Sequence, residues 1–321
     1  MKLRALLLST FYFFLFFFIS CQKEQVSDSA DENRTRDSLA LHVAVMPVMD
    51  CLPIYYAQHT GMFEAEDLDV RLEEYLSQMD CDTAIQYQRV EMAYTDILRV
   101  LQMKENVGVI TVMCGKLSLL TAHTKRIRQL KHLNERMIAL DRLSTADYWS
   151  DKLMSEAGLE TTDIYRPQIN DLRLRTSMLT EQLVDAALLP EPYATQAAMV
   201  GNKRMKSQLE GDSLPHFNCL AIQRKHLSDK HRKEQIKRFM AVYDKAVKAI
   251  NSKDCLQDTI RNILNHQYAM PTAVIDTLKI PPFLQSRKPS ENEVSEAIRW
   301  LQSRERAPKK QRCDSLLCKF R

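Results

Sequence analysis

Four short runs of residues with continuous rather than alternating apolar character constrain the fold of this chain most. They cover residues 43–46, 107–113, 137–140 and 186–189. Continuous runs are typical of strands in a parallel sheet, because helices cover both faces of such a sheet. Helical patterns lie between the runs. Strands that alternate with helices predict an α/β fold with mostly parallel sheets.

Two segments between and after these runs have clear helical patterns. The segment "STADYWSDKLMSEAGL" begins with Ser144 or Thr145 as an N-cap and stops at Gly158, with apolar residues on one face between them. The segment "KEQIKRFMAVYDKAVKAI" has apolar residues at spacings of three and four and charged residues on the other face. It is typical of an amphipathic surface helix that covers a core.

The chain also carries one local unit twice. The segment "DTAIQYQRV" leads to "EMAYTDILRVL", and "RTSMLTEQLV" leads to "DAALLPEPYATQA". Each unit is a helix, a short link, a strand of small and apolar residues, and an acidic residue, Asp96 or Glu191, that opens the next helix. The repetition predicts two similar halves.

The first 21 residues have the pattern of an export signal. Lys2 and Arg4 precede an apolar run over residues 5–19 that is shorter than the ~20 residues of a spanning helix. The following Ser20-Cys21 resembles a bacterial lipobox, in which Cys21 is lipidated, although Phe18 stands where leucine is usual. Ordinary cleavage and an uncleaved anchor are the alternatives. The polar residues 22–38 are expected to form a flexible tether.

Charge and cysteine spacing exclude several classes of function. The net charge is +4, and charges of both signs are interspersed, so nucleic acid is not an expected partner. Seven of the eight cysteines follow Cys21 without CxxC spacing, which favours neither a zinc ribbon nor a thioredoxin-type motif. Cys313 and Cys318 are close enough for a local disulfide. No cofactor is expected.

Four segments carry a resemblance to a known family: "MPVMDCLPIYYAQHTGMFEAEDLDVRL", "VEMAYTDILRVL", "RLSTADYWSDKLMSEAGL" and "LVDAALLPEPYATQA". Together they resemble the type II periplasmic solute-binding proteins of ABC transporters, in the branch that includes nitrate, sulfonate, taurine and thiamine-precursor receptors. The resemblance implies two α/β lobes that close on a solute. Lobe 1 would comprise 39–125 and 219–321, lobe 2 would comprise 126–218, and the hinge crossings would lie near 122–126 and 214–221.

The expected site follows from where such sheets bind ligands. Solutes collect beyond the carboxyl ends of the strands, where the N–H groups of helix N-termini attract acceptor-bearing groups. Turns of this kind, together with the stiff "PEPY" turn, supply the candidate ligand-binding residues: Met49, Asp50, Cys51, Ser77, Gln78, Thr95, Asp96, Cys114, Ser144, Thr145, Glu191 and Tyr193.

Each candidate has a structural alternative. Ser144, Thr145 and Asp96 can act only as helix caps, and Glu191 can serve a stiff structural turn or pair with a cationic ligand nitrogen. The Met-Cys pairs at strand ends are ordinary core residues, the lining of a polarisable pocket, or ligands for a soft metal such as Cu(I). A Cys51–Cys81 disulfide is geometrically conceivable. Scarce glycine weakens the expectation of an anion bound by backbone N–H groups, and the tyrosines near the cleft, Tyr94 among them, leave room for a flat ligand.

The function expected from these features is that of a monomeric, lipid-anchored receptor facing the periplasm in the cell envelope. It would capture a small solute, close around it and deliver it to the permease and ATPase of an ABC importer, without chemistry of its own. The alternatives are an enzyme on the same scaffold, of the pyrimidine-precursor or menaquinone-pathway type, and an orphan sensory binding protein.

Overall fold

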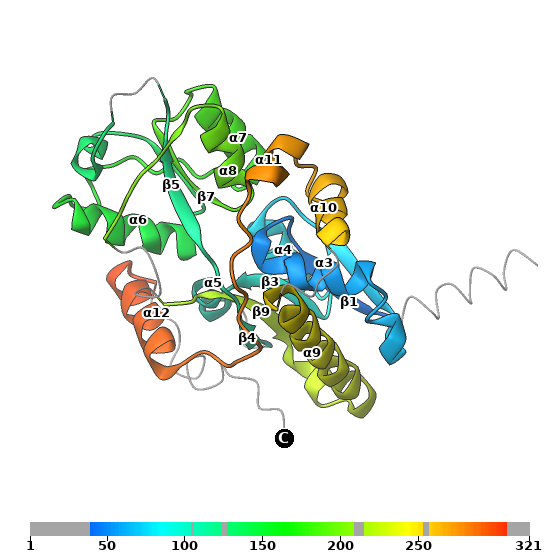
Figure 1. The fold of residues 1–321 in the computed structure, drawn as a ribbon. Helices are drawn as coiled ribbons and strands as arrows, with labels where there is room; N and C mark the ends of the chain where they lie inside the picture. Colours follow the sequence, from blue (N-terminus) through cyan, green and yellow to red (C-terminus); the bar gives the residue numbers. More distant parts are fainter. Residues whose placement is uncertain (1–38, 104–105, 124–126, 209–214, 253–256, 307–321) are drawn as a thin grey trace, which may run out of the picture. The chain divides into compact units, whose positions relative to one another are not determined.

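The computed structural model describes residues 39–103, 106–123, 127–208, 215–252 and 257–306. The chain divides into two units, Met1–Ala40 and Leu41–Arg321, and the second unit carries the folded domain. Cys21, the expected tether, Cys313 and Cys318 lie outside the described residues. In the part of the chain that is described, helices flank two separate β-sheets (Figure 1), which confirms the predicted two-sheet α/β class.

The first sheet has the strand order β2-β1-β3-β9-β4 among the described residues. Its strands are β1 (Leu41–Val45), β2 (Val70–Glu74), β3 (Met92–Asp96), β4 (Val107–Val112) and β9 (Asn218–Gln223). Strand β1 is parallel to β2 and β3, whereas β9 runs antiparallel between β3 and β4. Strand β9 is the segment with which the chain returns to the first sheet after passing through the second.

The second sheet has the order β6-β7-β5-β8 in the described part of the chain. Its strands are β5 (Leu117–Thr121), β6 (Ile138–Ala139), β7 (Ala186–Pro190) and β8 (Lys203–Arg204). Only the pairing of β6 with β7 is parallel among these described strands, so both sheets are mixed in direction. The four apolar runs of the sequence lie in β1, β4, β6 and β7.

The chain changes sheet between β4 and β5 and again between β8 and β9. The first change therefore falls between Val112 and Leu117, before the crossing expected near 122–126, because β5 already pairs with β7. The second change falls between Arg204 and Asn218, and residues 209–214 of that stretch lie outside the described residues. The division into two lobes stays a prediction.

Helices cover the sheets on several sides (Figure 1). The expected helix after Ser144 is α6, with Ser144 as its N-cap, and the amphipathic surface helix is α9. The α-helices of the described residues are α3 (Leu52–His59), α4 (Gln78–Gln86), α5 (Ile97–Gln102), α6 (Thr145–Glu156), α7 (Leu172–Thr180), α8 (Tyr193–Met199), α9 (Lys230–Asn251), α10 (Gln257–His266), α11 (Thr272–Thr277) and α12 (Glu291–Ser303).

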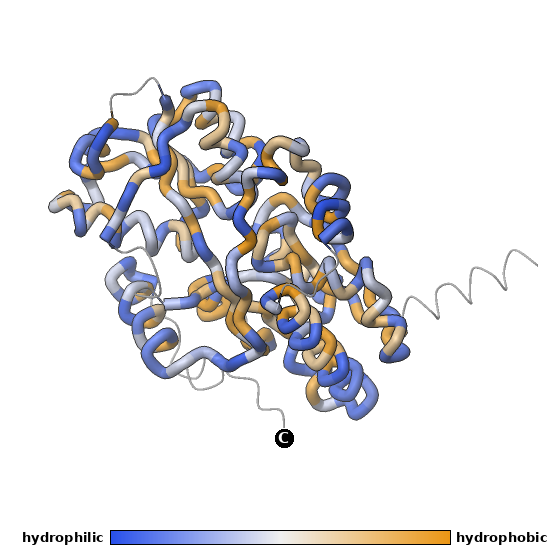
Figure 2. The backbone as a smooth tube through the Cα atoms, viewed as in Figure 1, coloured by the Kyte–Doolittle hydropathy of each residue, from blue (hydrophilic) through white to orange (hydrophobic). Residues whose placement is uncertain are grey.

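The core is built from apolar strand residues and the inner faces of these helices. Phe63 stacks on Phe239 of α9 with ring centroids 5.0 Å apart, and the rings of Tyr55 and Tyr268 meet edge to face at 5.3 Å. Figure 2 shows hydrophobic and hydrophilic residues together along α9, as an amphipathic helix requires. Burial of its apolar face fixes α9 against α3.

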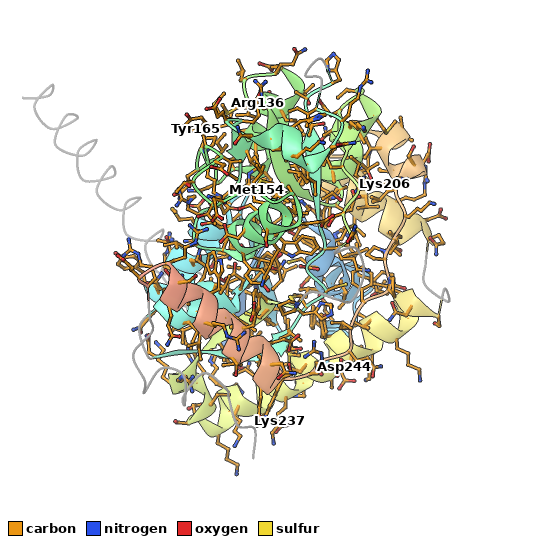
Figure 3. All side chains as sticks on the ribbon, turned by 90° about the vertical axis from the view of Figure 1, so that its left-hand side faces the viewer. Arg136, Met154, Tyr165, Lys206, Lys237 and Asp244 are labelled. Atoms are coloured by element: carbon orange, nitrogen blue, oxygen red, sulfur yellow. The ribbon has the colours of Figure 1, made fainter. Side chains whose placement is uncertain are left out.

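The C-terminal helices pack on other helices that flank the two sheets. Helix α10 contacts α3, α11 contacts α8, and α12 contacts α5. Helix α12 also reaches α6, since Trp300 Nε1 donates a 2.7 Å hydrogen bond to Asp151 Oδ2 and the ring of Trp300 lies 6.0 Å from that of Tyr148. Figure 3 shows α6, marked by Met154, beside α12.

Candidate functional site

A small cavity lies where the strands of the first sheet end opposite the start of α6. Its volume is about 30 Å³, which is the room that one water molecule takes up. Residues of both sheets and their helices line it: Met46, Val48, Gln78, Tyr94, Leu117, Asp141, Ser144, Thr145, Ala146, Leu172, Arg175, Pro190 and Asn218. The cavity therefore lies between the turn-bearing edges of the two sheets.

Asp50 supports one wall of the cavity. The 3₁₀ turn Met49–Cys51 after β1 places its carboxylate beside the ends of β3 and β9. Oδ2 accepts hydrogen bonds from Tyr94 Oη at 3.0 Å and from Asn218 Nδ2 at 2.8 Å, and Oδ1 accepts from the N–H of Gly115 at 2.8 Å. These bonds orient Tyr94 and Asn218, so Asp50 acts through residues that line the cavity.

Asp96 joins the first sheet to α6. It caps α5, because Oδ1 accepts from the N–H of Arg99 at 2.8 Å, and it is completely buried. Oδ2 accepts from Gln78 Nε2 at 2.8 Å and from the N–H of Thr145, the first residue of α6, at 3.0 Å. Burial raises the pKa of Asp96, while Arg99 and the hydrogen bond from Gln78 oppose that rise.

A second buried carboxylate, Asp82, lies behind Asp96. Its Oδ1 accepts a hydrogen bond from Thr95 Oγ1, and its Oδ2 lies 3.9 Å from Arg99 Nε. Burial raises the pKa of Asp82 to about 7, and the nearby Arg99 only partly offsets this effect. Asp82 is thus a buried group whose charge changes near neutral pH.

Arg175 and Asp141 form the charged wall of the cavity on the side of the second sheet. Arg175 is 1% exposed, and its Nη2 lies 2.6 Å from Asp141 Oδ2. Its Nε and Nη1 donate to the carbonyl oxygens of Ile169 and Leu188 at 2.7 and 3.1 Å. All three guanidinium nitrogens therefore face protein oxygens.

Apart from Arg175 Nη2, which is ion-paired with Asp141 Oδ2, two buried polar atoms on this wall have no hydrogen-bond partner among the described residues: Asp141 Oδ1 and Thr145 Oγ1. Both residues line the cavity, and they are 7% and 4% exposed. Buried polar atoms normally have partners, so these two mark the part of the cavity that is chemically unsatisfied.

Glu191 lies away from the cavity. Its Oε1 accepts from Arg204 Nη2 at 2.8 Å, and its Oε2 accepts from the N–H of Thr195 at 3.0 Å. It lines a larger groove of about 370 Å³ together with Trp149, Leu117 and other residues. Its carbonyl oxygen accepts from the N–H of Met49 at 3.0 Å, so the stiff turn helps to hold the two sheets together.

The cysteines at the strand ends behave as core residues. Cys51 and Cys81 are free and buried, so the conceivable disulfide between them is not formed. Burial raises the pKa of both thiols, which keeps them in the poorly nucleophilic thiol form. Within the described residues, no group of three or more His, Cys, Asp or Glu side chains could hold a metal ion.

The prediction that ligands bind beyond the carboxyl ends of the strands identified part of this lining. Of the twelve predicted residues, Gln78, Ser144 and Thr145 line the cavity, and Asp50 and Asp96 bond to residues that do. The cavity lining does not include the other seven, which are Met49, Cys51, Ser77, Thr95, Cys114, Glu191 and Tyr193. Contact with a ligand stays a prediction for all twelve.

Asp141, Arg175 and Asn218 were not among the predicted site residues. A signal for Arg175 exists in the sequence, because it shares one face of α7 with the buried residues Leu172, Thr176 and Leu179. A charged residue within a buried helix face is rare unless it is paired.

The sequence that forms this cavity also matches a known protein family. A family model described as "NMT1/THI5 like" matches residues 49–253. The chain belongs to the NMT1/THI5-like family. The matched range includes most of the residues that line the cavity, from Gln78 to Asn218. A search among curated proteins finds no match.

Solved structures share the NMT1/THI5-like fold at low sequence identity. The periplasmic aliphatic sulphonate binding protein SsuA from Escherichia coli is 14% identical, with a TM-score of 0.71 over 87% of this chain and 92% of that one. The periplasmic nitrate-binding protein NrtA from Synechocystis PCC 6803 is 9% identical, with a TM-score of 0.63 over 74% and 68%. The desulfurization enzyme DSZB is 11% identical, with a TM-score of 0.59 over 86% and 98%.

Proposed function

We propose that this protein is a solute receptor that captures a small molecule between its two sheets. The cavity carries this proposal, because its lining comes from both sheets and from the start of α6. A solute that contacts both sides stabilises the closed arrangement over an open one, since the open form lacks half of the contacts. The periplasmic binding proteins that share the fold support the same conclusion.

The receptor would deliver its solute to the permease and ATPase of an ABC importer. We place it in the cell envelope, facing the periplasm and held at the membrane by a lipid on Cys21. No helix in the described ranges combines the length and apolarity that a membrane crossing demands. The lipid anchor rests on the Ser20-Cys21 sequence alone.

An enzyme on the same scaffold is the second candidate, because DSZB shares the fold. The thiols of Cys51, Cys81 and Cys219 argue against a cysteine nucleophile at these positions, since burial raises the pKa of each. A sensory receptor without a permease has no specific observation in its favour.

Ligand-dependent stability tests the receptor function. Purified residues 22–321 should bind one small molecule per monomer, and native mass spectrometry of freshly prepared protein should detect a retained solute. At a hundredfold excess over the dissociation constant, a solute should raise the free energy of unfolding by about 2.7 kcal/mol. If no compound in a panel of oxyanions, sulfonates, pyrimidines, amines and amino acids raised Tm, the receptor function would be rejected.

Membrane fractionation tests the anchor separately. The full chain should sediment with membranes, and Cys21→Ala should move it to the soluble periplasmic fraction. A variant that stays with the membranes would rule out the lipid on Cys21 without affecting the receptor function.

A further inference from the structure

We propose that the cavity takes a solute through a cationic, hydrogen-bond-donating nitrogen and rejects oxyanions, because a carboxylate of the protein occupies the helix N-terminus that an oxyanion would need. This inference rests on the proposed receptor function and assigns the chemical class of its solute.

The start of α6 is the natural anion site of the cavity, since N–H groups at a helix N-terminus attract negative charge. In this protein the N–H of Thr145 donates to Asp96 Oδ2 at 3.0 Å, and the N–H of Ala146 donates to Ser144 Oγ at 3.1 Å. Both N–H groups are therefore used by protein oxygens. An oxyanion placed there would displace or oppose the buried carboxylate of Asp96.

Three N–H donors converge on Asp96, from Arg99, Gln78 and Thr145. Hydrogen bonds to the charged form favour the ionised carboxylate, although burial opposes ionisation. Gln78, the first residue of α4, lines the cavity but directs its amide nitrogen toward Asp96 Oδ2 and Thr95 Oγ1.

The unsatisfied atoms of the cavity point to the opposite charge. Asp141 Oδ1 is a free acceptor, and Thr145 Oγ1 is a hydroxyl that can accept, with both residues more than nine-tenths buried. The one guanidinium in the lining, Arg175, faces Asp141 and two carbonyl oxygens. A ligand nitrogen that carries hydrogens would satisfy Asp141 and Thr145 together.

The charge around the cavity agrees with this assignment. Asp141 and Arg175 line it, and Asp50 and Asp96 bond directly to lining residues. Three carboxylates thus stand against two guanidiniums, those of Arg175 and of Arg99 beside Asp96. An opposite charge placed close to an excess of carboxylates is stabilised.

The size of the cavity limits what enters it. About 30 Å³ admits a group as large as one water molecule, such as an ammonium. Leu117 lines both this cavity and the groove of about 370 Å³. Trp149 and Leu153 of α6 form an apolar wall of the groove, and its charged lining residues are Lys116, Glu191, Arg204 and Lys279. A solute with its nitrogen in the cavity can extend along Leu117 into this groove.

Removal of the carboxylate at Asp96 tests the predicted rejection of oxyanions. Asp96→Ser keeps a good N-cap for α5 and withdraws the carboxylate from Thr145. Methanesulfonate and nitrate, titrated against chloride at constant ionic strength, should leave the Tm of the wild-type protein unchanged and raise that of Asp96→Ser. The matched control is Asp229→Ser, which removes one charge from the N-cap of α9, away from the cavity lining, and should behave like the wild type.

Methylammonium and 2-phenylethylamine test the predicted binding of a cationic nitrogen. Both amines should raise the Tm of the wild-type protein, and 2-phenylethylamine should do so at a lower concentration. In Asp141→Asn, the apparent Kd of each amine should be at least tenfold higher. If Asp96→Ser does not give a folded circular dichroism spectrum, Asp96→Asn serves instead. It keeps a capping oxygen for Arg99, loses the charge and should also gain anion binding.

The outcomes separate this inference from the proposed function. Stabilisation of the wild-type protein by the anions, at the concentrations that act on Asp96→Ser, would overturn the charge assignment and leave a solute receptor. Failure of both amines on the wild-type protein would also overturn the charge assignment, whereas the receptor function is rejected only if the wider panel of solutes fails as well.

Discussion

The N–H of Met49 donates a 3.0 Å hydrogen bond to the carbonyl oxygen of Glu191, which joins the turn after β1 to the turn after β7. One turn belongs to the first sheet and the other to the second. The two sheets therefore meet through their backbones as well as through the side chains of the cavity.

Arg175→Met should destabilise the protein strongly. The change leaves Asp141 as a buried carboxylate without its cation and removes the donors to Ile169 and Leu188. The expected loss in the free energy of unfolding is about 3–5 kcal/mol, measured by urea denaturation. The double variant Arg175→Met/Asp141→Leu removes both charges and should recover part of the loss. An equal or greater loss in the double variant would contradict the assigned role of the pair.

Gly115→Ala should cost more stability than Gly158→Ala. Both glycines have positive φ, at +60° and +69°, so the backbone penalty is similar. A Cβ on Gly115 would lie 2.9 Å from Asn218 Cγ, whereas a Cβ on Gly158 would meet no heavy atom within 4 Å. We expect an extra loss of about 1–3 kcal/mol for Gly115→Ala in urea denaturation. Equal losses would show that Asn218 moves aside freely.

Glu293→Gln should reduce stability at neutral pH and much less at pH 2. Burial alone would raise the pKa of Glu293, but Arg287 and Ser290 donate hydrogen bonds that lower it from 4.5 to about 2. Because the pKa is lower in the folded state, this stabilisation is present above pH 4.5 and is lost as the pH falls toward 2.

The expected difference between Glu293→Gln and the wild type is about 3 kcal/mol at most above pH 5, measured by urea denaturation at several pH values. Glu291→Gln, in the first turn of the same helix, is the matched control and should show a smaller effect. A difference that did not change with pH would exclude the ionised Glu293 as its source.

Asp82→Asn should flatten the pH dependence of stability between pH 4 and 7. The pKa of Asp82 is raised from 3.8 to about 7, so the folded protein holds a proton that the unfolded chain releases in this range. Stability of the wild type therefore falls as the pH rises from about 4 to about 7. Asparagine can still accept from Thr95 and carries no titrating proton. A Tm profile as steep as that of the wild type would refute the assignment.

Much of the fold could be predicted because continuous apolar runs are a local signal. The apolar runs predicted the strands β1, β4, β6 and β7, and the N-cap at Ser144 predicted the start of α6. Strand β5 is half-buried at Leu117 and Ser118, and its partners among the described strands, β7 and β8, are distant in sequence. Its place in the second sheet therefore depends on tertiary packing that no local pattern records.

The residues of the candidate site also include some that a local sequence pattern predicts and some that only the folded structure shows. Gln78, Ser144 and Thr145 follow from the rule that ligands collect at the carboxyl ends of strands. Arg175 reaches the cavity from α7, and Asp141 lines the cavity beside it as its ion-pair partner. Asp96 was expected as a cap or a ligand contact. Its bond to Thr145 joins segments 49 residues apart and could be seen only once the sheets were in place.

The contacts of helix α12 affect how the proposed receptor would release its solute. It packs on α5, and its Trp300 and Glu296 bond to Asp151, Tyr148 and Lys152 of α6. Parting the sheets must either break these bonds or carry α12 along with α6. In the proposed receptor, side chains outside the cavity lining would therefore slow the release of the solute, and its residence time could be altered without changing how it is recognised.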